Sequence, residues 1–149
     1  MSTYTETVGT KLNELLEKTY DAEKGYLKAA ENTDHSLLNL YFKKRSKERY
    51  SFGQELKAEI LKFGEEPEKE GSITGQVHRA WMDTKALFSA NDAESMLEES
   101  IRGEKTAVAD YEDVLKDTAL PPSTSSLLTS QMKQIKSDLN TIKFLEDLS

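Results

Sequence analysis

The stretch Leu16–Glu31, LEKTYDAEKGYLKAAE, decides the fold of this chain because its apolar residues recur at the spacing of a helix. It belongs to a stripe with intervals of four and three residues: Leu12, Leu16, Thr19, Glu23, Tyr26 and Ala30. Such a stripe predicts a helix with one buried face, yet that face includes the carboxylate of Glu23. A buried carboxylate is unfavourable unless a cation, a proton or hydrogen-bond donors offset its charge.

A second copy of this stretch lies further along the chain. LEESIRGEKTAVADYE, at residues 97–112, aligns with it without a gap and places Glu104 over Glu23. Two other segments, which begin with SLL at positions 36 and 126, align in the same way and place Asp138 over Glu48. The chain therefore reads as a duplicated helix pair, in which each long helix carries one carboxylate on its apolar stripe.

Helical periodicity continues through most of the chain. It covers four long segments, about Thr7–Glu31, Leu37–Phe63, Leu97–Leu115 and Leu128–Leu145. Thr3 and Glu6 have the spacing of a capping box before the first segment. Between the second and third segments, the acidic stretch GEEPEKEG precedes a shorter periodic segment that carries Val77, Trp81, Thr84 and Phe88 on one face.

The order of short and long connections predicts the architecture. Short breaks within each helix pair favour antiparallel neighbours, and the longer connection between the pairs has room for a crossover. We therefore expect residues 1–149 to form one all-α domain, a ferritin-like four-helix bundle with one long crossover between its second and third helices. The segment around Trp81 is predicted to be a short extra helix within that crossover.

Composition argues against several classes of function. The chain has 149 residues, with 20 Lys and Arg against 27 Asp and Glu, and no basic run dense enough to follow a phosphate backbone, so nucleic acid is not an expected partner. No apolar stretch approaches a membrane span and the N-terminus lacks a signal-peptide pattern, so we expect a cytoplasmic protein without membrane contact. Cysteine is absent, and no phosphate loop, Ser/His/Asp arrangement or HExxH motif indicates an enzyme.

The candidate metal ligands are the four carboxylates on the stripes, Glu23, Glu48, Glu104 and Asp138. Ferritin-like di-metal sites use a Glu from two helices and Glu-x-x-His from the other two. Here Ser51 and Thr141 stand at the histidine positions, so the nitrogen ligands are absent. An all-oxygen site of this kind would suit a divalent metal, with Fe, Mn, Mg and Ca as the candidates.

A second interpretation needs no metal. Arg45 lies one turn before Glu48 on the same stripe, and a guanidinium there would neutralise a carboxylate. Polar side chains near the stripes would supply further donors, namely Ser51, Thr141, Thr19, Gln131 and the tyrosine hydroxyls. A register shifted by one turn would instead leave Glu23 or Glu104 at the bundle edge, in solvent.

Longer stretches resemble a known family. KLNELLEKTYDAEKGYLKAAE, the run from Glu48 to Ala86, and LEESIRGEKTAVADYEDVL followed by LPP are similar to the bacterial ferritin-like family known as domain of unknown function 2383. The most specific part is G-S-x-x-G-x-x-H-R-x-W-M-D at Gly71–Asp83. The resemblance covers nearly the whole chain and implies a ferritin-like bundle without an established activity. The first two helices also resemble bacterioferritin, in a register that puts Thr19 at a metal-ligand position, which argues against ferroxidase chemistry.

Two hypotheses for function follow. The leading one is a ferritin-like bundle without ferroxidase activity that is stress-related or binds a protein partner. The alternative is a di-metal carboxylate protein that uses the four stripe carboxylates as oxygen ligands. Assembly into a homo-oligomer is a further expectation, in which the long helices and Trp81 would supply the contact.

Overall fold

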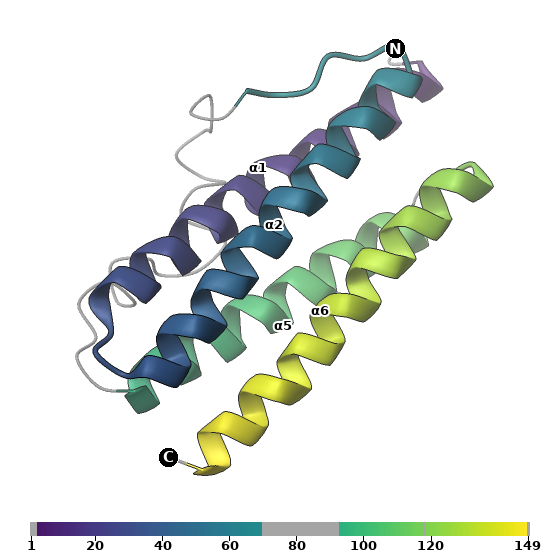
Figure 1. The fold of residues 1–149 in the computed structure, drawn as a ribbon. Coiled ribbons are helices and arrows are strands. Elements are labelled where there is room, and N and C mark those ends of the chain that lie inside the picture. Colours follow the sequence, from purple (N-terminus) through teal and green to yellow (C-terminus); the bar gives the residue numbers. More distant parts are fainter. Residues whose placement is uncertain (1–2, 70–92, 118, 149) are drawn as a thin grey trace.

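The computed structural model describes residues 3–69, 93–117 and 119–148, and within them four helices and no strand. The helices are α1 Tyr4–Asn32, α2 Ser36–Lys62, α5 Ala93–Asp117 and α6 Pro122–Leu148. They confirm the predicted all-α four-helix bundle (Figure 1). The predicted crossover helix around Trp81 lies outside the described residues.

The helices pack as two pairs, α1 with α2 and α5 with α6 (Figure 1). The break between α1 and α2 is short, and the side-chain amide of Asn39 donates to the carbonyl of Ala30 across it at 2.7 Å. Further along, a Cβ built on Gly53 of α2 would lie 3.7 Å from the side chain of Leu16, an ordinary van der Waals distance. The two helices are therefore packed at normal contact distance here.

Local signals fix the helix ends. The predicted capping box is confirmed, because the Thr3 hydroxyl accepts from the Glu6 amide at 3.2 Å and the Glu6 carboxylate accepts from the Thr3 amide at 3.4 Å. At the start of α2, a ring nitrogen of His35 accepts from the Leu38 amide at 3.4 Å and caps this helix. The end of α2 is a Schellman motif in which Gly64 has a φ of 73°, a value that favours glycine.

The core consists of two apolar clusters. One contains Val8, Leu12, Leu15, Leu16, Tyr20, Phe52, Leu56, Ile60, Ala107, Tyr111, Val114, Leu128 and Ile135. The other contains Ala22, Tyr26, Ala29, Ala30, Leu38, Tyr41, Phe42, Met96, Leu97 and Ile142. On α2, Arg45 and Arg49 lie in sequence between the residues of the two clusters, and Glu104 and Asp138 do so on α5 and α6. The middle of the bundle is therefore a charged layer between two apolar ones.

Candidate functional site

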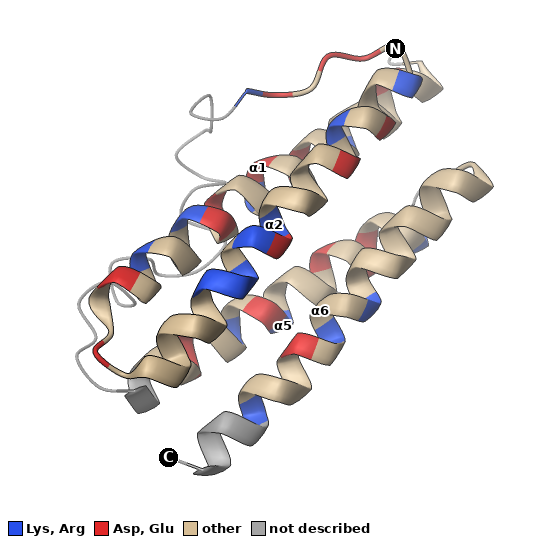
Figure 2. Ribbon diagram, in the orientation of Figure 1, with Lys and Arg blue, Asp and Glu red and all other residues tan. Residues whose placement is uncertain are grey.

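The charged layer is built around two arginines of α2. The Arg45 guanidinium forms ion pairs with Asp138 of α6 and, at 3.1 Å, with Glu48 one turn further along its own helix. The side chains are all largely buried, with 15% of Arg45, 14% of Glu48 and 4% of Asp138 exposed. Lys and Arg are blue and Asp and Glu red in Figure 2, where both colours meet on facing helices near the middle of the bundle. Arg45 therefore joins α2 to α6.

The second arginine, Arg49, is buried more deeply. Its guanidinium pairs with the carboxylate of Glu104 on α5, and it also approaches Glu48 at 3.5 Å. Only 2% of the Arg49 side chain and none of the Glu104 side chain is exposed. Because neither charge reaches solvent, each depends on the other for neutralisation. Arg49 therefore joins α2 to α5, and Glu48 lies between the two arginines.

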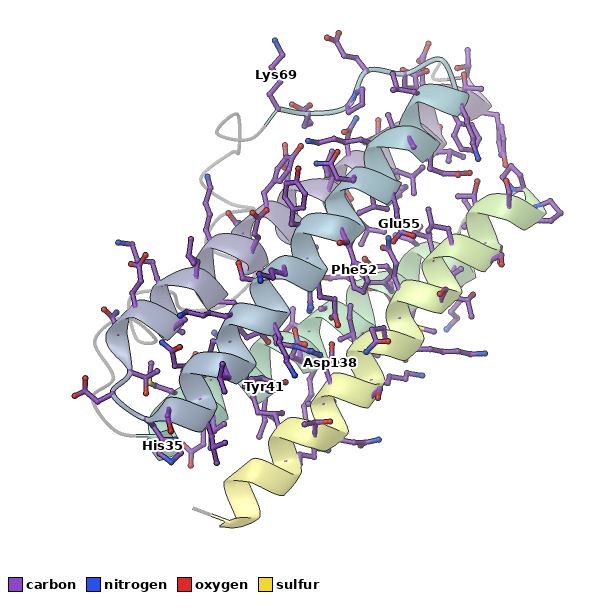
Figure 3. The ribbon with its side chains drawn as sticks, in the orientation of Figure 1. His35, Tyr41, Phe52, Glu55, Lys69 and Asp138 are labelled. Carbon is purple, nitrogen blue, oxygen red and sulfur yellow. The ribbon has the colours of Figure 1, made fainter. Side chains whose placement is uncertain are left out.

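Aromatic rings enclose the ionic groups. The Arg45 guanidinium lies 5.2 Å from the centre of the Tyr41 ring, and that of Arg49 lies 5.9 Å from the Tyr26 ring, within the range of cation–π contact. The Tyr41 hydroxyl donates to the backbone carbonyl of Asp138 at 3.1 Å, across the space between α2 and α6 (Figure 3). The Tyr26 hydroxyl and Ser100 hydroxyl lie 2.9 Å apart. These contacts hold the side chains of the layer in place.

The layer has three carboxylates for two guanidiniums, so it carries one excess negative charge when all are ionised. Burial raises the pKa of Glu104 above its ordinary value, although Arg49 opposes the shift. Burial also raises the pKa of Glu48, against the opposing effect of Arg45 and Arg49. Burial would lower the pKa of Arg49, but the Glu104 carboxylate raises it above its ordinary value. Burial therefore favours the protonated form of Glu104 and Glu48, while Arg49 keeps its charge.

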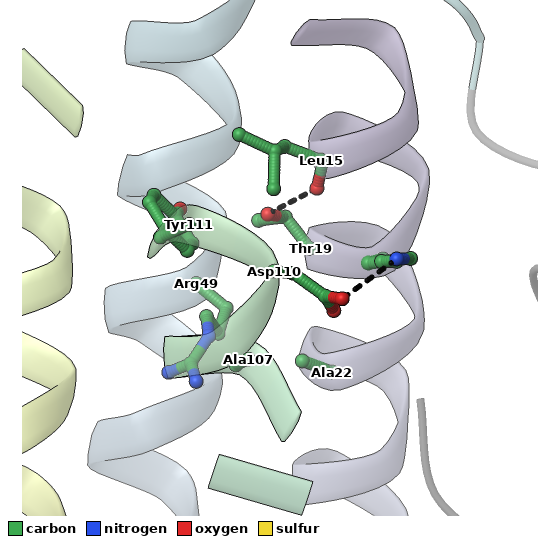
Figure 4. Close-up of a pocket in the computed structure, with 8 residues that line it drawn as sticks. Leu15, Thr19, Ala22, Arg49, Ala107, Asp110 and Tyr111 are labelled. Carbon is green, nitrogen blue, oxygen red and sulfur yellow. Dashed lines mark hydrogen bonds and ion pairs between the residues drawn. The ribbon is translucent and has the colours of Figure 1, made fainter. Parts of the chain in front are cut away.

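Some polar atoms of the layer lack a hydrogen-bond partner within the described part of the chain. They are Nε of Arg45, Oε2 of Glu104 and Oδ2 of Asp138. Arg49 also borders a small cavity between α1 and α5, where Thr19, Ala107 and Tyr111 form part of the wall (Figure 4). Its volume of about 10 Å³ is at the lower limit for one water molecule. A substrate or an organic cofactor does not fit in this cavity.

The predicted metal ligands lie as follows. Glu48, Glu104 and Asp138 come together in the charged layer, and their oxygens face guanidiniums. Glu23 is half-buried on α1, where its backbone carbonyl accepts from the Ser46 hydroxyl at 3.0 Å. A divalent ion would have to compete with two cations that the chain itself supplies. Over the described ranges, no group of three or more His, Cys, Asp and Glu side chains is arranged to hold a metal ion.

The predicted partners of the carboxylates are partly wrong. Arg45 neutralises Glu48 and Asp138 as expected, but Ser51 and Thr141 are exposed. Of the other predicted donors, the Tyr26 hydroxyl forms a side-chain hydrogen bond with Glu104, whereas Thr19 and Gln131 bond elsewhere. Thr19 donates to the backbone carbonyl of Leu15 at 2.7 Å, and Gln131 donates to the carbonyl of Phe52 at 3.3 Å and to the Glu55 carboxylate at 3.1 Å. A helical residue can reach its own preceding turn more easily than a carboxylate on another helix.

Arg49 is the residue that sequence reasoning missed. The predicted stripe of α2 ran through Arg45, Glu48 and Phe52, whereas the most deeply buried stripe runs through Phe42, Ser46, Arg49, Phe52, Leu56 and Ile60. The sequence did contain a signal for Arg49, because intervals of three and four residues place it on a stripe between Phe42 and Phe52. The two stripes differ by one position over part of the helix, which is enough to bring a second guanidinium into the core.

Comparison with known proteins adds the family. None of the described helices is long and apolar enough to cross a membrane. A search of curated proteins finds none that matches this sequence. A family model matches residues 7–117, which include most of α1, all of α2 and α5, and the charged residues that these helices bring to the layer. The chain therefore belongs to the family described as Domain of unknown function (DUF2383).

Proposed function

We propose that the protein is a non-catalytic, ferritin-like bundle that acts by binding a protein partner, and that its buried charged layer is a structural clasp between the two helix pairs. The observation that carries the clasp, and with it the non-catalytic function, is the position of Arg45 and Arg49. Their guanidiniums meet Glu48, Glu104 and Asp138 from three helices at the middle of the core. In a ferritin-like bundle, carboxylates in this part of the core bind metal ions. Here the chain provides the positive charge itself.

A metal-binding function is the second candidate. It is favoured by Oε2 of Glu104 and Oδ2 of Asp138, two buried oxygens with no hydrogen-bond partner in the described part of the chain. Such oxygens are ligands that a hard cation such as Mn²⁺ or Mg²⁺ prefers. Glu48, with its raised pKa, and Glu23 on α1 would complete the predicted ligand set. A metal there would require at least one arginine to move out of the layer.

Metal titration separates the two candidates. Protein purified without chelator would be analysed for metal content and then heated with and without excess Fe²⁺, Mn²⁺, Mg²⁺ or Ca²⁺. The clasp predicts no stoichiometric metal and an unchanged Tm, because a ligand that binds only the folded state would raise the Tm. A Glu104→Gln variant is the matched control, since it keeps the shape of the side chain and removes its charge. Stoichiometric metal in the wild type that is lost in Glu104→Gln would overturn the clasp.

A further inference from the structure

The solvent face of α2 differs from an ordinary polar helix surface. It presents the residues Leu37, Leu40, Lys43, Lys44, Lys47 and Tyr50, which we call the α2 strip. Their intervals of three and four residues place them on one side of the helix, opposite the core. The large apolar side chains are well exposed, with 59% of Leu37, 57% of Leu40 and 55% of Tyr50 accessible. Solvation alone does not favour so much exposed apolar surface on one face.

The charge of the α2 strip is opposite to that of the protein. α2 contains seven Lys and Arg against three Glu, in a chain whose net charge is −7. The strip's lysines, Lys43, Lys44 and Lys47, are exposed, and no ion pair involves them within the described residues. Consecutive turns in the middle of α2 are blue in Figure 2. A basic surface on an acidic protein attracts negatively charged partners and orients them at this face.

A second copy of the chain fits the strip poorly. A two-fold contact of strip with strip would bring lysines against lysines, which repel each other. The acidic helix α5, with eight Asp and Glu against three Lys and Arg, would complement the charge. The exposed large apolar side chains of the described residues, however, lie on α1 and α2 and not on α5. Such a contact would leave Leu37 and Leu40 facing polar groups.

An anionic membrane also fits the strip poorly. Helices that lie on membranes segregate an apolar face from a basic one. On α2 both kinds of residue lie on the same face instead: Leu37 and Leu40 come first, the three lysines follow, and Tyr50 comes last. The net negative charge of the rest of the chain would also be repelled by anionic headgroups. A protein surface that has carboxylates between apolar side chains on one face matches this pattern better.

We infer that the α2 strip is the docking surface for another protein, through an acidic amphipathic helix of that partner. The partner's Asp and Glu side chains would pair with Lys43, Lys44 and Lys47, and its apolar side chains at intervals of three and four would cover Leu37, Leu40 and Tyr50. This inference rests on the proposed function, because it names the chemistry of the partner. The metal titration tests the buried layer and not the α2 strip, so the proposed function and this inference can fail separately.

A peptide binding assay tests this inference. The probe is a fluorescent synthetic helix of Glu and Leu, with leucines at intervals of three and four, and fluorescence anisotropy measures its affinity for the full chain. Poly-glutamate is the control for charge alone. We expect the peptide to bind more tightly than poly-glutamate, and to bind more weakly as salt increases. Lys43→Glu with Lys47→Glu should weaken binding about tenfold, because each reversal replaces an attraction with a repulsion. Leu40→Ser should weaken it several-fold.

A matched variant and two rival probes complete the test. Lys133→Glu with Lys143→Glu changes the charge by the same amount on exposed positions of α6 and should leave peptide binding unchanged. Circular dichroism would establish that every variant is folded. Equal binding of peptide and poly-glutamate, or equal loss in the α2 and α6 variants, would overturn the inference. It would also be overturned by strip-dependent binding to phosphatidylserine vesicles in place of the peptide, or by self-association that depends on Lys43 and Lys47.

Discussion

Replacing Arg49 with Met is the sharpest test of the buried clasp. The substitution keeps the length and flexibility of the side chain but removes the guanidinium that neutralises Glu104. Only 2% of Arg49 and none of Glu104 is exposed, so the pair belongs to the fully buried class, in which loss of one partner costs about 3–5 kcal/mol. An exposed pair would contribute about 1 kcal/mol or less. The expected loss is thus a large fraction of the 5–15 kcal/mol that is typical of a folded domain.

Urea denaturation followed by circular dichroism would measure this loss. With a urea dependence of about 2 kcal/mol per molar, the unfolding midpoint should fall by about 1.5–2.5 M. Adding Glu104→Met to Arg49→Met should restore most of the stability, because an apolar pair leaves no buried charge without a partner. Lys43→Met, an exposed change on the same helix, should shift the free energy of unfolding by about 0.5 kcal/mol or less. If the double variant is as unstable as the sum of its single changes, the two residues do not form a clasp.

Three further predictions use the same denaturation measurement. Burial holds the folded-state pKa of Glu104 above its ordinary 4.5, so ionisation of Glu104 disfavours folding. As pH rises from about 4.5 to 7, the stability of the wild type should therefore fall relative to that of Glu104→Gln. A stability difference that does not change with pH would contradict this. Glu59→Ala removes the buried acceptor of the Thr124 hydroxyl, 2.6 Å away, and should reduce stability by about 1–2 kcal/mol, whereas Gln54→Ala, at an exposed position of the same helix, should cost less. Gly64→Ala should reduce stability by about 1 kcal/mol through backbone strain alone, since nothing lies within 4 Å of the added Cβ. Gly64→Asn should reduce stability less, because Asn adopts a positive φ more readily than Ala. Equal losses of stability in the two variants would argue against strain.

Periodicity was sufficient to predict the helices of the bundle. Intervals of three and four residues locate α1, α2, α5 and α6, and the Thr3–Glu6 capping box is confirmed at the start of α1. The helix ends were less predictable, because a cap depends on side-chain direction as well as residue type. His35, for example, caps α2 through a ring nitrogen, a role that Asn, Asp, Ser and Thr fill more often.

The partners of the candidate site were harder to predict than its carboxylates. Glu48, Glu104 and Asp138 are in the core, as their stripes indicated. Which cation meets each of them depends on how α2 is rotated about its axis. One position along the helix corresponds to about 100° of rotation, so Arg49 was excluded by a stripe that differed from the buried one by a single residue. Periodicity within one helix therefore predicts the direction of its buried face only to within about 100°.

The division of charge in the central layer has a consequence for how the two helix pairs recognise each other. The pair α1–α2 supplies both arginines and Glu48, and the pair α5–α6 supplies Glu104 and Asp138. In the aligned positions of α6, Ile135 and Leu139 stand where α2 has Arg45 and Arg49. Because one Glu48 cannot balance two guanidiniums, two copies of the first pair would bring together excess positive charge, and two copies of the second pair would bring together carboxylates. Although the halves are similar in sequence, each is complementary to the other and repels a twin of itself, so like-with-like assembly during folding is disfavoured.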